Sequence, residues 1–179
     1  MRRSRASIDE GKLIGSLIKK KKAGRSTHVY FNKNSNGTTK YFTGIFISEK
    51  NGGKSYTYRS SYELRCYELL EEDTLVVSYE AESFTLEYID MAGKTRLYIP
   101  DLLVLFKDGS LQVWEVKPEV MLLNGDVQRK AAACRQFMHH NFKDVVHSYK
   151  FITEKHLFQS ASDYIKFIAL QKAKKWDDK

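Results

Sequence analysis

The sequence has little proline and cysteine, and it lacks long hydrophobic runs. Two prolines among 179 residues, no low-complexity tract and 42% hydrophobic residues favour one globular domain with extensions over a disordered chain. No apolar run approaches the roughly 20 residues that a membrane-spanning helix needs. The short run Leu13–Ile18 is followed by lysines, so it does not form the apolar centre of a signal peptide. We therefore expect no membrane-spanning segment, and no membrane is among the expected partners.

The two cysteines, Cys66 and Cys134, lie far apart and do not have the spacing of a metal site. Two cysteines are too few for a disulfide scaffold. Both fall in helical patterns, so we expect buried free thiols in a reducing cytosol. The chain also lacks a glycine-rich phosphate loop and a glycine-flanked serine nucleophile, which excludes those two kinds of site.

Charge is distributed unevenly along the chain, whose net charge is +8. Residues 1–25 carry +7, residues 26–59 carry +4 and residues 121–179 carry +5, whereas residues 60–120 carry −8. Basic ends favour a polyanionic partner, with nucleic acid first and a membrane surface second; plain solubility is the alternative. The lysine run 19–22 leaves a DNA-binding arm, a localisation signal and a solubilising tail open.

Periodicity predicts an α/β fold made of three parts. Residues 1–26 are predicted to form a basic arm with a short helix over Ile8–Lys20, and residues 27–58 a β-rich extension with a hairpin or small sheet. Residues 59–179 form the core: a helix over 59–73, strands over 74–90 (one long or two short), 95–106 and 110–118, a helix over 124–142, a strand over 149–154 and a helix over 160–176. This αβββαβ order predicts a mixed central sheet flanked by helices.

Glu63 lies near the start of the first core helix. It follows Ser60 by three residues, which is the spacing of a capping box, with Ser60 or Ser61 as the cap. Tyr67 and Leu70 share its helix face, so Glu63 is not clearly on the solvent side. Glu80 and Glu82, which alternate on the first core strand, are interpreted as solvated edge charges, with a supporting role at a site as the alternative.

The stretch "YIPDLLVLFKDGSLQVWEVKPE" places charged residues inside two apolar runs. If "KDG" (107–109) is a hairpin turn, facing residues have numbers that sum to about 216, which sets Asp101 opposite Glu115 within one or two residues. Glu115 and Lys117 share a strand face because side chains alternate. Facing carboxylates lie about 5 Å apart and repel unless a cation or proton lies between them. Oxygen ligands favour Mg²⁺ or Mn²⁺. A salt bridge on the outer face of the hairpin is the alternative.

Pro100-Asp101, thirteen intervening residues and then Glu115-Val116-Lys117 resemble the motif of the PD-(D/E)xK nuclease superfamily. That superfamily places its acidic pair on the second and third strands of an αβββαβ core, and it often carries a glutamate on the preceding helix, here Glu63. The segments "YIPDLLV", "EVKP" and "FITEKHL" resemble the TnsA-like endonucleases of heteromeric transposases most closely. The head-completion nucleases of tailed phages look similar too, sharing "TYRS". The likeness covers residues 56–158.

The resemblance implies a restriction-endonuclease-like fold and a DNA endonuclease that depends on Mg²⁺ or Mn²⁺. It implies that Asp101 and Glu115 ligate the metal with the Val116 carbonyl, that Glu63 helps to bind a second ion or its water, and that Lys117 orients the attacking water. Lys130, on the following helix, is expected to reach the scissile phosphate, with an ordinary surface lysine as the alternative.

The implied partner is DNA, with a transposase or phage-assembly protein as a further partner and a dimer for double-strand cleavage. The implied location is the cytoplasm of a bacterium or an infected host cell. The alternatives are a non-catalytic DNA-binding or structural protein on the same fold, and a homing or repair endonuclease. The intact set of two carboxylates and a lysine favours a catalytic protein.

Overall fold

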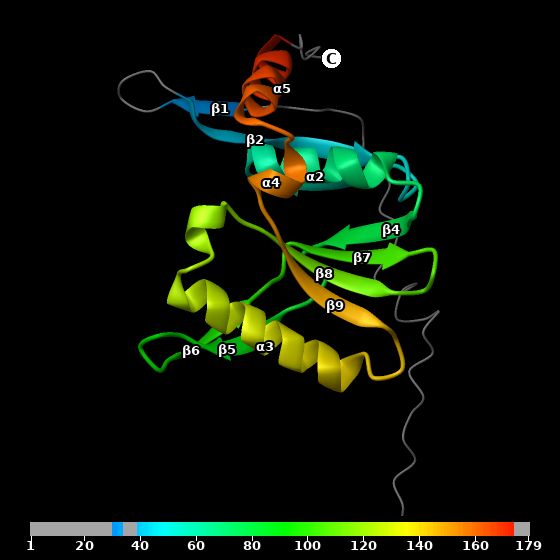
Figure 1. Cartoon of the computed structure of the whole chain (residues 1–179), viewed down its shortest axis with the longest axis vertical. Coiled ribbons are helices and arrows are strands. Elements are labelled where there is room, and N and C mark those ends of the chain that lie inside the picture. Colours follow the sequence, from blue (N-terminus) through cyan, green and yellow to red (C-terminus); the bar gives the residue numbers. More distant parts are fainter. Residues whose placement is uncertain (1–29, 34–38, 174–179) are drawn as a thin grey trace, which may run out of the picture.

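The computed structural model describes residues 30–33 and 39–173. The expected helix over Ile8–Lys20 and the lysine run 19–22 lie outside the described residues. The described chain forms a four-stranded sheet, a three-stranded sheet and a two-stranded ribbon, with helices packed on them (Figure 1). No helix in this part of the chain combines the length and the apolarity that crossing a bilayer requires.

The four-stranded central sheet has the order β4-β7-β8-β9. Strands β4 (Val76–Ala81), β7 (Leu102–Phe106) and β8 (Leu111–Val116) pair antiparallel, whereas β9 (His147–Ile152) runs parallel to β8. Helix α2 (Ser61–Glu72) precedes β4, and helix α3 (Gly125–Asn141) connects β8 to β9. The predicted αβββαβ core with a mixed sheet is confirmed, and it is consistent with a restriction-endonuclease-like fold.

The two core helices cover opposite faces of the sheet. Leu102 and Val104 of β7 pack in one core cluster with Leu64, Tyr67 and Leu70 of α2. Their neighbour Leu103 packs in a second cluster with α3. This alternation follows from the two-residue period of a strand. The α3 residues that are buried, Val127, Ala131, Cys134 and Met138, recur at helical spacing along one stripe.

The predicted single strand over 95–106 is wrong. The chain forms two strands there, and between Tyr98 and Leu102 it passes from a two-stranded ribbon into the central sheet. Strand β6 (Thr95–Tyr98) pairs with β5 (Leu86–Ile89) in a separate ribbon, and β5 packs on α3. Pro100 has no N–H to donate to a ladder, and Asp101 begins the bend that leads into β7. The region 74–90 accordingly forms two short strands, β4 and β5.

Within the segment predicted as a β-rich extension, the described residues form a three-stranded antiparallel sheet of β1 (Tyr30–Lys33), β2 (Thr39–Ser48) and β3 (Lys54–Tyr58). Tyr56 and Tyr58 of β3 are buried in the same cluster as Leu64 of α2. The remaining elements are η1 (Glu119–Met121), α4 (Glu154–Leu157) and α5 (Ala161–Ala173). Cys66 and Cys134 are free and buried, as predicted.

Candidate active site

The β7–β8 hairpin sets the geometry of the site. Leu102 faces Trp114 and Leu105 faces Leu111, which is the predicted register. One position beyond the ladder, Asp101 comes opposite Glu115. The Val116 N–H donates a hydrogen bond of 2.7 Å to Asp101 Oδ2. The hairpin therefore holds the first carboxylate against the backbone of the strand that carries the second.

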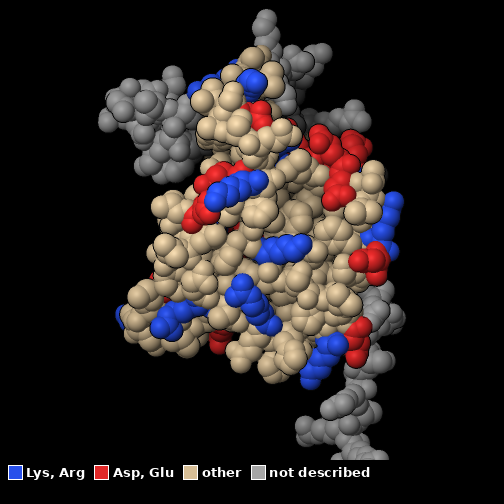
Figure 2. Space-filling model, viewed as in Figure 1, with Lys and Arg blue, Asp and Glu red and all other residues tan. Residues whose placement is uncertain are grey.

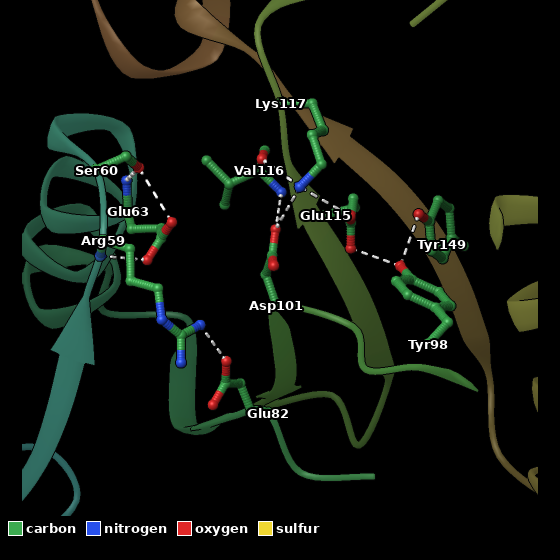
Figure 3. A network of polar contacts seen from close by, with 10 residues as sticks. All are labelled: Arg59, Ser60, Glu63, Glu82, Tyr98, Asp101, Glu115, Val116, Lys117 and Tyr149. Carbon is green, nitrogen blue, oxygen red and sulfur yellow. Dashed lines mark hydrogen bonds and ion pairs between the residues drawn. The ribbon is translucent and has the colours of Figure 1, made fainter. Parts of the chain in front are cut away.

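The side chains of Asp101, Glu115 and Lys117 converge at the end of this hairpin (Figure 3). Lys117 Nζ lies 2.9 Å from Glu115 Oε1 and 3.5 Å from Asp101 Oδ2. The Glu115 side chain is 5% exposed, whereas those of Asp101 and Lys117 are 27% and 29% exposed. The site is therefore half-open, with its most buried acid at the back.

The charges of this cluster do not balance. Burial, and then repulsion from Glu115, raise the pKa of Asp101 to about 7, although Lys117 and the Val116 N–H act against the rise. Burial by itself would lower the pKa of Lys117, but attraction to Asp101 and Glu115 raises it overall. Lys117 therefore stays protonated at neutral pH, and one ammonium group faces two carboxyl groups. Full ionisation of Asp101 is therefore disfavoured unless a further cation is present, and this is the electrostatic condition for holding one.

Glu63 lies in the first turn of α2, where it takes part in the helix cap. The Ser60 hydroxyl accepts a 3.1 Å hydrogen bond from the Glu63 N–H and donates one of 3.1 Å to Glu63 Oε1. The Arg59 N–H donates to Glu63 Oε2 at 2.8 Å. Of the two predicted alternatives, Ser60 and Ser61, Ser60 is the cap. Glu63 and Asp101 both line one narrow pocket, and the charge of Glu63 adds to the rise in the pKa of Asp101.

Two further charged residues line the same pocket. Arg59 and Glu82 form an ion pair of 2.5 Å beside Asp101. The Glu82 N–H also donates to the Asp101 carbonyl at 3.1 Å. Glu82 has a φ of +49°, a conformation that residues other than glycine adopt uncommonly. Glu80, by contrast, pairs with Lys54 away from this pocket.

Two tyrosines with no predicted role complete the network. The Tyr98 hydroxyl donates a 2.5 Å hydrogen bond to Glu115 Oε2, and it lies 3.2 Å from the Tyr149 hydroxyl. Tyr98 begins the stretch "YIPDLLV". In the sequence, Tyr98 looks like any other aromatic residue of a strand. The break in the strand at Pro100, which places the Tyr98 hydroxyl beside Glu115 of β8, was not predicted.

Lys130 lies beside the network without contacting a carboxylate in the described part of the chain. Its Nζ lies 5.5 Å from the centroid of the Tyr88 ring and 5.6 Å from that of the Tyr98 ring. Cations at such distances are attracted to the ring face. Lys130 therefore adjoins the site through Tyr98.

The face formed by α3 and β9 carries mostly basic charge. Figure 2 shows Lys and Arg across this face, with most Asp and Glu toward its upper and right-hand margins. Exposed basic residues of α3, the following loop and β9 are Arg129, Arg135, Lys143 and Lys150. Helix α2, on the opposite face of the sheet, carries four glutamates and one arginine.

The donor chemistry of the site suits a hard divalent cation. Asp101 and Glu115 supply carboxylate oxygens, and the Val116 carbonyl, which accepts from Lys117 Nζ at 3.2 Å, is a third oxygen beside them. Oxygen donors of this kind are those that Mg²⁺ and Mn²⁺ prefer. Within residues 30–33 and 39–173, no three His, Cys, Asp or Glu side chains lie close enough together to hold a metal by themselves. The candidate ligands for a divalent cation are therefore the Asp101 and Glu115 carboxylates and the Val116 main-chain carbonyl.

A mixed sheet in αβββαβ order, with one acid directly before its second strand, another on its third strand and a lysine two residues further on, is consistent with a restriction-endonuclease-like fold. Residues 73–154 match the family model described as TnsA-like endonuclease N terminal. This match confirms the resemblance to the TnsA-like endonucleases and is consistent with the PD-(D/E)xK superfamily. The matched segment contains Asp101, Glu115 and Lys117, and it therefore suggests a nuclease that acts on DNA.

Glu63 precedes the matched segment. No curated protein matches the chain. The likeness to phage head-completion nucleases stays a prediction.

Proposed function

We propose that this protein is a DNA endonuclease that depends on Mg²⁺ or Mn²⁺ and hydrolyses phosphodiester bonds. The observation that carries the proposal is the convergence of Asp101 and Glu115 on one protonated lysine, which leaves excess negative charge in a half-open site. Asp101 and Glu115 would hold the ion with the Val116 carbonyl. A divalent ion bound there lowers the pKa of a water molecule and stabilises charge on the attacked phosphate.

The residues of this chain have separate tasks in the proposed reaction. Lys117, which is protonated and held by both carboxylates, orients the attacking water and offsets charge on the phosphate. Glu63, fixed by the α2 cap beside Asp101, would help to hold a second ion or its water. Lys130 has a lesser role near the scissile phosphate, and packing on the tyrosine rings is its alternative.

The basic face of α3 and β9 supports DNA as the substrate, because clustered Lys and Arg neutralise backbone phosphates. A single site cuts one strand at a time. We therefore propose either a dimer or sequential nicking for double-strand cleavage, with a transposase or phage-assembly protein as the partner that selects the DNA.

The test is a cleavage assay on supercoiled, linear and branched DNA, with and without Mg²⁺ or Mn²⁺. The expected result is metal-dependent nicking or cutting that Asp101→Ala abolishes, since it removes a metal ligand and the acid that faces Glu115. Lys107→Ala, at the far end of the same hairpin, is the matched control and should cleave as the unmodified protein does. Robust metal-dependent cleavage by the Asp101→Ala protein would contradict the proposal.

A non-catalytic DNA-binding protein is the second candidate. The observation that favours it is that both oxygens of Glu63 already take part in the α2 cap, which leaves two carboxylates for an ion. Titration calorimetry with Mn²⁺ separates the two candidates. Binding that disappears in Asp101→Ala favours the nuclease, and absence of binding together with retained DNA affinity favours the second candidate.

A further inference from the structure

Each oxygen of the Glu115 carboxylate is held by a different side chain. Oε1 lies 2.9 Å from Lys117 Nζ, on the side of the site that Asp101 shares. Oε2 accepts a hydrogen bond of 2.5 Å from the Tyr98 hydroxyl (Figure 3). The carboxylate is therefore fixed in rotation, with one oxygen toward the site and the other toward the tyrosine.

Tyr98 is itself held firmly. It is 4% exposed, and its hydroxyl lies 3.2 Å from that of Tyr149. Its ring lies beneath Lys130 Nζ and meets the Tyr88 ring edge-on, with 6.4 Å between centroids. A carboxylate oxygen only accepts, so the Tyr98 hydroxyl is the donor in its hydrogen bond to Glu115.

We propose that Tyr98 is a positioning residue that determines which divalent ion the site prefers. This inference rests on the proposed function, in which Asp101 and Glu115 hold such an ion. The Tyr98 hydroxyl holds Oε2, so Glu115 turns Oε1, which Lys117 Nζ also contacts, toward the position proposed for the ion. The Val116 N–H engages Asp101 Oδ2 in a comparable way, so each carboxylate has one oxygen already bound to a fixed donor.

Ligation through single oxygens discriminates between ions. Mg²⁺ is small and requires a near-octahedral arrangement of ligands at short distance, whereas Ca²⁺ takes six to eight oxygens and often binds a carboxylate through both of its oxygens. Mn²⁺ accepts the same oxygen ligands as Mg²⁺. A Glu115 carboxylate that is prevented from binding through both oxygens favours Mg²⁺ and Mn²⁺ over Ca²⁺.

The test compares Mn²⁺ and Ca²⁺ affinities of the full chain by titration calorimetry. In Tyr98→Phe, the ring stays and the donor is lost, so the dissociation constant for Mn²⁺ should rise about tenfold, the lower end of what lost support for a ligand costs. Ca²⁺ affinity should stay level or increase, so the preference for Mn²⁺ over Ca²⁺ narrows by about tenfold or more. A purely structural role would weaken both ions equally and leave this ratio unchanged.

Tyr88→Phe is the matched control. Tyr88 belongs to the same ribbon and lies beneath the same lysine, so its variant should keep the Mn²⁺ to Ca²⁺ ratio of the unmodified protein. Melting curves in EDTA check that each variant is folded. Should Tyr98→Phe not fold, Tyr149→Phe removes the neighbouring hydroxyl and should narrow the ratio by about twofold to threefold, because the donor is then less well held.

The outcomes separate this inference from the proposed function. If the unmodified protein prefers Mn²⁺ and Tyr98→Phe, or Tyr149→Phe in its place, keeps that ratio, the role of Tyr98 is overturned and the nuclease proposal stands. If the unmodified protein binds neither ion, both proposals fail together. A ratio that narrows in Tyr98→Phe and not in Tyr88→Phe supports the inference.

Discussion

Glu71 on α2 and the acidic pair of Asp101 and Glu115 at the β7–β8 hairpin differ in how their charge is satisfied. Glu71 of α2 accepts hydrogen bonds from Ser48 Oγ at 2.5 Å, the Tyr79 hydroxyl at 2.6 Å and the Lys50 N–H at 3.0 Å. In that cluster one acid has three donors. At the end of β8, by contrast, two acids, Asp101 and Glu115, share one ammonium group, and each accepts from one further donor, the Val116 N–H and the Tyr98 hydroxyl.

The difference separates an acid that supports the fold from acids that are available to a ligand. Glu71 connects α2 to β2, β4 and the turn after β2, so its partners are all parts of the fold. Asp101 has a pKa raised to about 7 because burial and Glu115 disfavour its charged form. An arrangement that costs stability in the free protein is typical of functional sites.

The largest expected effect on the cleavage rate comes from removing the Lys117 ammonium group that Asp101 and Glu115 share. Lys117→Ala should reduce the rate of DNA cleavage by roughly 10²–10⁴-fold, the usual contribution of a side chain that handles the attacking group. Lys117→Arg should not restore the rate, because a planar guanidinium does not replace a compact ammonium group. The nicking rate of supercoiled DNA measures both variants. A Lys117→Ala protein with an unchanged rate would contradict this role.

Removing Glu71, the acid that supports the fold, should lower the free energy of unfolding and leave the cleavage rate unchanged. Glu71→Ala leaves the buried hydroxyls of Ser48 and Tyr79 without their acceptor, which costs about 1–3 kcal/mol of unfolding free energy. Urea unfolding measures this loss. The same protein should keep its cleavage rate below its melting range. A comparable loss of cleavage in folded Glu71→Ala would remove the distinction between the two clusters.

The pH dependence of stability is a smaller effect. The pKa of Asp101 is raised to about 7 from an ordinary value of 3.8, so between these values the folded state binds more protons than the unfolded state. Stability of the metal-free protein should therefore fall as pH rises from about 4 to about 7, and then level off. Asp101→Asn removes this contribution and should have the higher melting temperature at pH 8. Melting curves in EDTA across this range test it, and identical pH profiles for both proteins would count against it.

The smallest effect is expected at Lys130. Its Nζ contacts tyrosine rings, and such contacts contribute about 0.5–1 kcal/mol. Lys130→Ala should therefore lower the cleavage rate about twofold to fivefold, by loosening Tyr98. Steady-state rates against DNA concentration check this. A loss above roughly a hundredfold would instead indicate direct contact with the phosphate.

Much of the core could be predicted because its signals are local. The spacing of Val127, Ala131, Cys134 and Met138 predicts the buried stripe of α3. The turn at 107–109 fixes the register that brings Asp101 opposite Glu115, since pairing in a hairpin follows from the position of its turn. The capping role of Ser60 follows from its spacing to Glu63 in the same way.

What could not be predicted depends on contacts between distant segments. Tyr98 reaches Glu115 only because the chain breaks at Pro100 and β6 pairs with β5 outside the central sheet. Tyr149 joins them because β9 pairs parallel to β8 after an intervening helix. The donors of Glu71 likewise come from β2, the turn after it and β4. No local pattern in the sequence carries this information.

The most direct test of the account is to compare Asp101→Ala and Glu71→Ala for Mg²⁺-dependent nicking of supercoiled DNA, under conditions where both are folded. The account predicts that Asp101→Ala loses nicking at every Mg²⁺ concentration, whereas Glu71→Ala keeps the rate of the unmodified protein. Nicking by Asp101→Ala at the unmodified rate would contradict it.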